Sequence, residues 1–202
     1  MSRYSRSRFL PVLLVVVVMI IAIVALVSLA RAIFFSGDRT SETSQQTNVG
    51  REALLNTSEG HSVRMTIRGP IVADEAFNSY RITITPSSRS LVTYSGYLGG
   101  QIDEIRLSNN IPAYEEFVHA LDKANLALGT QFPEEKDDTR GICATGRIYE
   151  YEIINGDEVV KRLWTSTCKG SPGSLQASTD QLTNLFKVQI PDANNVLSKI
   201  RI

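Results

Sequence analysis

Two cysteines and two histidines are the side chains of this 202-residue chain best suited to nucleophilic, acid–base or metal chemistry. Cys143 and Cys168 could supply a nucleophile or join in a disulfide, and His61 and His119 could act as general bases or metal ligands. A cysteine nucleophile needs a free thiolate with a base nearby. A disulfide needs two Cα atoms within about 7 Å. The elements that position these side chains therefore decide which chemistry is available.

The segment between the cysteines predicts a β-hairpin. Asn155 and Gly156 separate two strand-like runs, and this dipeptide is a strong signal for a two-residue turn, in which both central residues need positive φ. With these two residues at the turn, the continued ladder places Cys143 opposite Cys168. A non-hydrogen-bonded pair at that position has a Cα separation close to the one a disulfide tolerates. We therefore predict a Cys143–Cys168 disulfide.

The same register gathers aromatic and basic side chains on one face of the hairpin. Aromatic residues and arginine are enriched at the energetic centres of protein interfaces. The alternative is that this face is the core side of a sheet, because a sheet must cover one face. The candidate binding patch consists of Arg147, Tyr149, Tyr151, Arg162 and Trp164.

The run Thr165 to Cys168 (TSTC) resembles the nucleophile-bearing strand of the sortase transpeptidases, which combine a strand-end cysteine with an upstream histidine and a downstream arginine. The resemblance implies Cys168 as the nucleophile and His119 as the histidine. It covers only a few residues, His119 lies in a helical pattern, and no arginine follows Cys168 before Arg201. The alternative function is therefore an exported enzyme, either of this type or a hydrolase whose site combines residues distant in sequence.

Metal and cofactor sites are not expected from the sequence. His61 and His119 are isolated from each other, and the acidic run 133–138 lacks the Asp/Asn–Gly spacing of a calcium loop. No serine lies in a GxSxG motif, and no glycine-rich phosphate loop is present. We therefore predict no metal and no cofactor.

Residues 9–35 predict a transmembrane signal anchor. The run FLPVLLVVVVMIIAIVALVSLA is uncharged and about as long as a helix that crosses a bilayer. Residues 1–8 contain arginines and no acid, so they are expected in the cytoplasm and the rest of the chain on the other side. Cleavage near Ala32 is the alternative. Both alternatives export the same domain.

The remaining chain predicts a flexible polar stalk over residues 36–60 and one extracytoplasmic domain over residues 61–202. Four of the 21 basic residues lie at positions 3, 6, 8 and 31, so the rest of the chain carries four more acidic than basic residues. A mildly acidic domain without a basic stripe argues against a nucleic-acid partner.

Two periodicities predict an α+β domain with a mainly antiparallel sheet and one or two packed helices. Apolar residues alternate with polar ones in short runs bounded by glycine and proline, at 63–67, 80–84 and 91–94. Apolar residues recur at helical spacing over 112–128 and 179–188.

These features favour a non-catalytic binding or assembly domain of the cell envelope. Residues 9–35 would hold it in the membrane, and the domain would lie at the cell surface or in the periplasm. Its expected partner is another envelope or surface protein.

Overall fold

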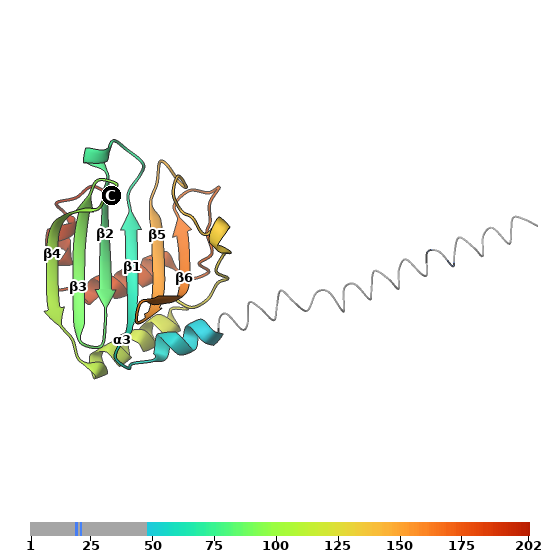
Figure 1. The fold of residues 1–202 in the computed structure, drawn as a ribbon, viewed down its shortest axis with the longest axis horizontal. Helices are drawn as coiled ribbons and strands as arrows, with labels where there is room; N and C mark the ends of the chain where they lie inside the picture. Colours follow the sequence, from blue (N-terminus) through green and yellow to red (C-terminus); the bar gives the residue numbers. More distant parts are fainter. Residues whose placement is uncertain (1–18, 20, 22–47) are drawn as a thin grey trace, which may run out of the picture. The chain divides into compact units, whose positions relative to one another are not determined.

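The computed structural model describes residues 19, 21 and 48–202 (Figure 1). The predicted cytoplasmic segment (1–8) lies outside the described residues. So do the predicted span (9–35), apart from residues 19 and 21, and the predicted stalk as far as residue 47. Within the described part of the chain, no helix combines the length and apolar character that crossing a bilayer requires.

Six strands form one antiparallel sheet, in the order β4-β3-β2-β1-β5-β6 (Figure 1). The first four strands follow one another as a meander, and the last two form a hairpin that joins the free side of β1. The predicted α+β class is confirmed. The strands are β1 (His61–Arg68), β2 (Asn78–Ile84), β3 (Ser88–Ser95), β4 (Gly100–Ser108), β5 (Ile148–Asn155) and β6 (Glu158–Ser166).

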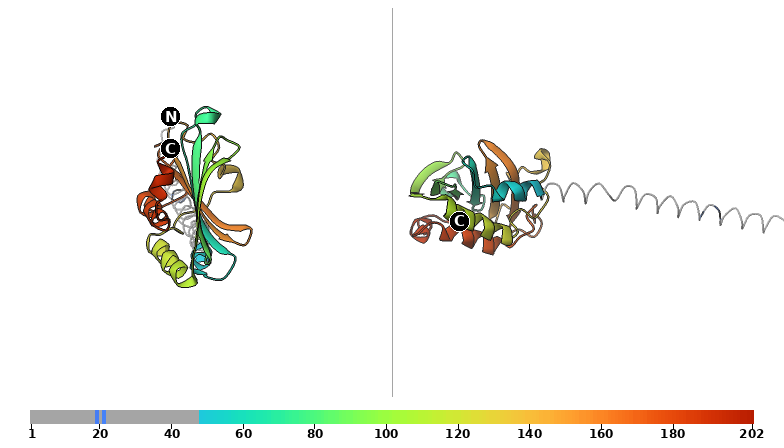
Figure 2. Two further views of the ribbon diagram at one scale, coloured as in Figure 1. Left: turned by 90° about the vertical axis from the view of Figure 1, so that its left-hand side faces the viewer. Right: turned by 90° about the horizontal axis from the view of Figure 1, so that it is seen from below.

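Three helices cover one face of the sheet, as Figure 2 shows: α3 (Ile111–Lys123), α4 (Thr179–Val188) and α5 (Ala193–Leu197). The residues of β1 alternate between buried and half-buried, as a strand with one covered face requires. Phe186 of α4 packs edge-on against Phe117 of α3, with ring centroids 5.3 Å apart. Two short 3₁₀ turns, η1 (Asp74–Ala76) and η2 (Glu134–Lys136), lie in the connecting loops.

A short helix over residues 48–55 begins the folded domain. Its Leu54 is 0 % exposed and belongs to the hydrophobic core. Arg51 on the same helix forms an ion pair of 2.7 Å with Asp122 of α3. The stalk predicted over residues 36–60 is therefore shorter at its C-terminal end, because Leu54 is buried in the core rather than solvated.

The predicted hairpin forms, but its register is wrong. The two-residue loop lies between Asn155 and Glu158, one residue later than predicted. Asn155 stays in β5 because it pairs with His61 of β1 on its other side. An irregularity after Ile153 then shifts the ladder again. Long-range pairing with β1 thus overrides the local turn signal.

Replacing Asn110 by Ala is expected to lower the free energy of unfolding by about 1 kcal/mol. The Asn110 side chain accepts a hydrogen bond of 3.0 Å from the Ala113 N–H at the start of α3, and alanine cannot. Equilibrium urea unfolding measures the change. Asn184→Ala, at an exposed position within α4, is the control. Equal destabilisation by both substitutions would contradict the capping role.

Candidate functional site

The predicted disulfide between Cys143 and Cys168 is present, with Cα atoms 5.4 Å apart. The pairing is confirmed, although the register that suggested it is wrong: the β5–β6 ladder ends at Ile148 and Ser166, and both cysteines lie beyond it. Cys143 lies in a turn, with a φ of 55°. A Cβ atom at Gly146 would collide with Cys143 Sγ, so this glycine lets the turn close against the bridge.

The bridge removes the thiol that a cysteine nucleophile requires. No cysteine in the described residues is free. His119, the histidine implied by the sortase resemblance, lies on the exposed side of α3, with Nε2 4.0 Å from the Glu115 carboxylate. The oxidised chain therefore offers no nucleophile at Cys168. Across residues 48–202, no group of three His, Cys, Asp or Glu side chains is placed to hold a metal ion.

The five residues predicted as one binding patch are divided between the two faces of the sheet. Tyr149 and Tyr151 lie on the helix side, where the Tyr151 hydroxyl is 3.1 Å from Thr183 Oγ1 of α4. Arg147, which precedes β5, lines a pocket on this side together with Tyr149.

Arg162 and Trp164 lie on the helix-free side of the sheet. Both side chains donate to the carboxylate of Asp137, each over 3.0 Å. The register explains the division: Tyr149 faces Thr165 instead of Arg162, a shift of three residues. An odd shift moves every side chain of one strand to the other face.

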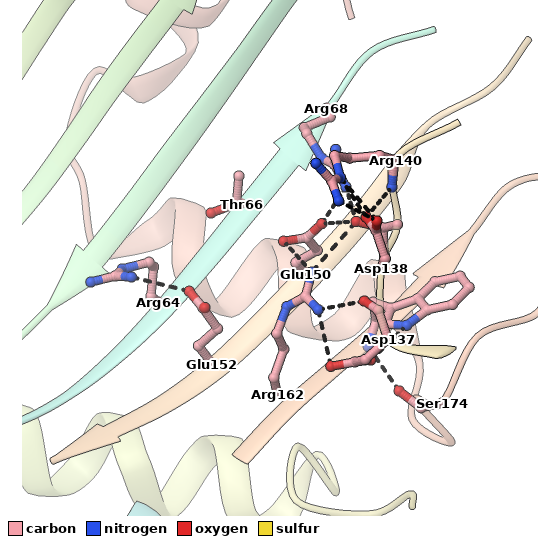
Figure 3. A network of polar contacts seen from close by, with 12 residues as sticks. Arg64, Thr66, Arg68, Asp137, Asp138, Arg140, Glu150, Glu152, Arg162 and Ser174 are labelled. Carbon is pink, nitrogen blue, oxygen red and sulfur yellow. Dashed lines mark hydrogen bonds and ion pairs between the residues drawn. The ribbon is translucent and has the colours of Figure 1, made fainter. Parts of the chain in front are cut away.

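A network of charged side chains lies on the helix-free face around Glu150 (Figure 3). Arg68 of β1 and Arg162 of β6 both form ion pairs with its carboxylate, and the Arg162 contact is 3.2 Å. The Thr139 hydroxyl donates to Glu150 Oε1 over 2.7 Å. The network thus ties the loop that contains Asp137 and Thr139 to three residues of the sheet.

Electrostatics keep the Glu150 network charged. Burial alone raises the pKa of the Glu150 carboxyl, but Arg68, the Thr139 hydroxyl and Arg162 together bring it below its ordinary value. Burial opposes the charge of Arg162, whereas Glu150 and Asp137 raise its pKa. These mutual contacts make the network a structural clamp on the loop rather than an open binding site.

An exposed apolar surface lies at the end of the sheet where β1 ends. We call it the tip surface and define it as Ile71, Val72, Tyr97 and Leu98. Leu98 is 100 % exposed, and the other three residues are 41–50 % exposed. Tyr97 and Leu98 form the β3–β4 turn, and the glycine before them has the positive φ, 69°, that the turn requires.

Local contacts hold the tip surface in place. Asp74 Oδ1 accepts the Tyr97 N–H over 2.7 Å, and the Tyr97 hydroxyl donates to the Val72 carbonyl over 2.7 Å. The Tyr97 ring stacks on Phe77, with centroids 4.2 Å apart. The loop before β2 and the β3–β4 turn are therefore joined, although more than twenty residues separate Val72 from Tyr97.

A cavity of about 110 Å³ opens beside the tip surface. We call it the tip pocket. Its lining is mostly apolar and comes from three segments, the loop before β2, the β3–β4 turn and the loop before β5. The lining includes Ile71, Phe77, Tyr97, Ile142 and Ile148, with Arg68 and Arg140 as the charged members.

The tip surface was not predicted from the sequence, because Tyr97 and Leu98 belong to neither a strand nor a helix pattern. The available signal was an apolar pair inside a glycine-bounded turn, Gly96 to Gly99, where polar residues are usual. Comparisons with known proteins add no assignment: no family model matches the chain, and no curated protein matches its sequence.

Proposed function

We propose that this protein is a membrane-tethered, extracytoplasmic binding or assembly domain of the cell envelope, without catalytic activity, and that its tip surface binds another envelope protein. The apolar run at residues 9–35 supports the tether. The Cys143–Cys168 bridge supports an oxidising compartment outside the cytoplasm.

One observation carries the proposed binding role: a fully exposed leucine stands on a turn that the fold holds in place. Burying Leu98 in an interface would recover its hydrophobic free energy, on the order of 2 kcal/mol. Because Tyr97 is already fixed by Asp74 and Phe77, a partner would order little additional backbone. A surface that is already fixed loses less conformational entropy on binding, and Tyr97 is of a residue type enriched at interface centres.

The tip pocket supplies a complementary feature for a partner. Its volume of about 110 Å³ and its apolar walls suit one aliphatic or aromatic side chain. The two arginines that line it, Arg68 and Arg140, already pair with Glu150 and Asp138, so the apolar walls supply the complementarity. The proposed partner therefore presents an apolar residue to this pocket.

The position of the tip surface suits a tethered domain. The chain enters the fold through residues 48–55, next to the start of β1, and the tip surface lies where β1 ends (Figure 1). An eight-residue strand spans about 26 Å. The proposed binding surface is thus at the end of the sheet remote from the point where residues 48–55 enter the fold.

Photo-crosslinking in the native membrane tests this proposal. A p-benzoyl-phenylalanine at position 98 of the full chain is expected to give one adduct of defined mass. The same probe at the exposed position 158, at the other end of the sheet, is expected to give none. Absence of an adduct at position 98, or equal yields at both positions, would contradict binding through the tip.

Leu98→Asp is expected to change the free energy of unfolding by less than about 0.5 kcal/mol, because the side chain is fully exposed. The same substitution is expected to abolish the adduct formed by a probe at position 72. Thermal unfolding and crosslinking yield measure the two effects. If Leu98→Asp lowers the stability of the domain and also abolishes crosslinking, Leu98 has a structural role instead.

A further inference from the structure

A second pocket, of about 200 Å³, lies on the helix side of the sheet. We call it the helix-side pocket. The end of β1 and the starts of β2 and β5 form its floor, while α4, α5 and the tail after α5 form its sides. Two of the five residues of the predicted binding patch, Arg147 and Tyr149, line it.

Two cations from different elements face this pocket. Arg147 precedes β5, and Lys187 lies on α4, with Nζ 6.0 Å from the centroid of the Tyr80 ring. Neither side chain has an ion-pair partner among the described residues. By contrast, Arg64 and Arg68 on the opposite face each pair with a glutamate. Both charges are therefore available to pair with an anionic ligand.

The Tyr80 hydroxyl is a second group without a partner. Tyr80 is only 4 % exposed and lines the pocket, and in the described part of the chain its hydroxyl makes no hydrogen bond. Among the described residues, the buried side-chain polar atoms without a partner are Arg64 Nε and Arg68 Nε, so the Tyr80 hydroxyl reaches solvent in the pocket and can donate to a ligand there. Burial, with smaller effects from Tyr149 and Tyr151, raises the pKa of Tyr80, so the phenol keeps its proton and can donate it in a hydrogen bond.

Apolar side chains form the rest of the wall: Ile67 from β1, Leu197 from α5, and Ile200 and Ile202 from the tail. The cavity is smaller than the roughly 300–1,000 Å³ of pockets that hold drug-sized ligands. It therefore suits a short ligand with one charged end. A guanidinium binds a carboxylate through two parallel hydrogen bonds, and a phenol adds a third donor.

We propose that the helix-side pocket binds a carboxylate that carries a short apolar body. Arg147 and Lys187 neutralise the carboxylate, Tyr80 donates a hydrogen bond to it, and the isoleucine and leucine side chains cover the apolar part. This site is independent of the tip surface. A free short-chain acid and the C-terminal residue of a peptide share this chemistry.

Isothermal titration of the full chain in detergent with hexanoate tests the proposal. Saturable binding is expected, and Arg147→Gln or Lys187→Gln should weaken it about tenfold each, the effect of one lost charge-assisted hydrogen bond. Tyr80→Phe should weaken it several-fold. Arg106→Gln, which removes an arginine of β4 that pairs with Glu104, is the matched control and should bind like the wild type.

Three comparisons define the ligand class. Hexanol should bind at least tenfold more weakly than hexanoate, and inorganic phosphate should not compete. A peptide ending in a free leucine should bind, and the same peptide with a C-terminal amide should not. The affinity of the free peptide compared with that of hexanoate then shows whether the pocket prefers a peptide C terminus or a free short-chain acid. No saturable hexanoate binding, equal binding of hexanol, or unchanged affinity in Arg147→Gln would overturn the proposal.

Discussion

Replacing Glu150 by Ala is expected to lower the free energy of unfolding by about 3–5 kcal/mol, the usual cost of removing one partner from a buried ion pair. The Glu150 side chain is 13 % exposed and neutralises both Arg68 and Arg162. Its removal leaves the two guanidinium groups close together, and Thr139 loses its acceptor. Equilibrium urea unfolding measures the loss, because the midpoint falls while the slope stays constant.

Glu104→Ala is the matched control for this prediction. Glu104 also pairs with an arginine, Arg106, but this pair lies at the exposed edge of the sheet on β4. Exposed ion pairs contribute little to stability. If Glu150→Ala costs no more than Glu104→Ala, the network around Glu150 is not the clamp that fixes the loop at residues 137–139.

The same carboxyl is expected to make stability depend on acid pH. Burial opposes ionisation of Glu150, but its cationic neighbours bring its pKa in the folded state below the unfolded value of about 4.3. The stabilising contribution is therefore complete above that value and is lost as the pH falls through the folded pKa. Glu150→Gln should give a shallower decline of stability than the wild type below about pH 4.5. If the stability of Glu150→Gln and of the wild type declined equally with falling pH, Glu150 would not be the group responsible.

Removal of the disulfide, by replacing Cys143 and Cys168 with Ser, is expected to lower the free energy of unfolding by about 3 kcal/mol. The bridge closes a loop of 25 residues, and opening it restores the entropy of the unfolded chain. For a domain of this size the melting temperature should fall by about 6–12 °C. Calorimetry of the wild type with and without reductant provides the control, and an unchanged melting temperature would contradict the prediction.

The bridge also lies close to the proposed binding surface. The turn that contains Cys143 continues from Ile142, which lines the tip pocket, and the Ala144 carbonyl accepts the Ile71 N–H over 2.8 Å. The double serine variant should therefore also reduce crosslinking from position 98. If the variant is destabilised but still crosslinks from position 98, binding through the tip surface does not depend on the disulfide.

The elements of this fold were largely predictable from local patterns. Alternation at 63–67 and 80–84 identified β1 and β2, and helical spacing identified α4 over the residues it occupies, Thr179–Val188. The predicted helix over 112–128 ends earlier, at Lys123, because Asn125 adopts a φ of 61°. These patterns succeed because they reflect which side of each element meets the core.

The register of the β5–β6 hairpin and the tip surface could not be predicted from local patterns. The Asn155-Gly156 signal describes only the turn, whereas the pairing of Asn155 with His61 depends on a strand almost a hundred residues earlier. Similarly, Val72 and Tyr97 form the tip surface only because β2 and β3 bring their loops together. The sites that matter for binding here are made by contacts between distant segments.

The thiol state of the full chain in intact cells tests whether the domain is exported and held outside the cytoplasm. Cells are quenched in acid and the protein is alkylated with a mass tag, with and without prior reduction. Neither Cys143 nor Cys168 is expected to be tagged until reductant is added. Tagging of both cysteines without reductant would place the domain in a reducing compartment and contradict the proposed function.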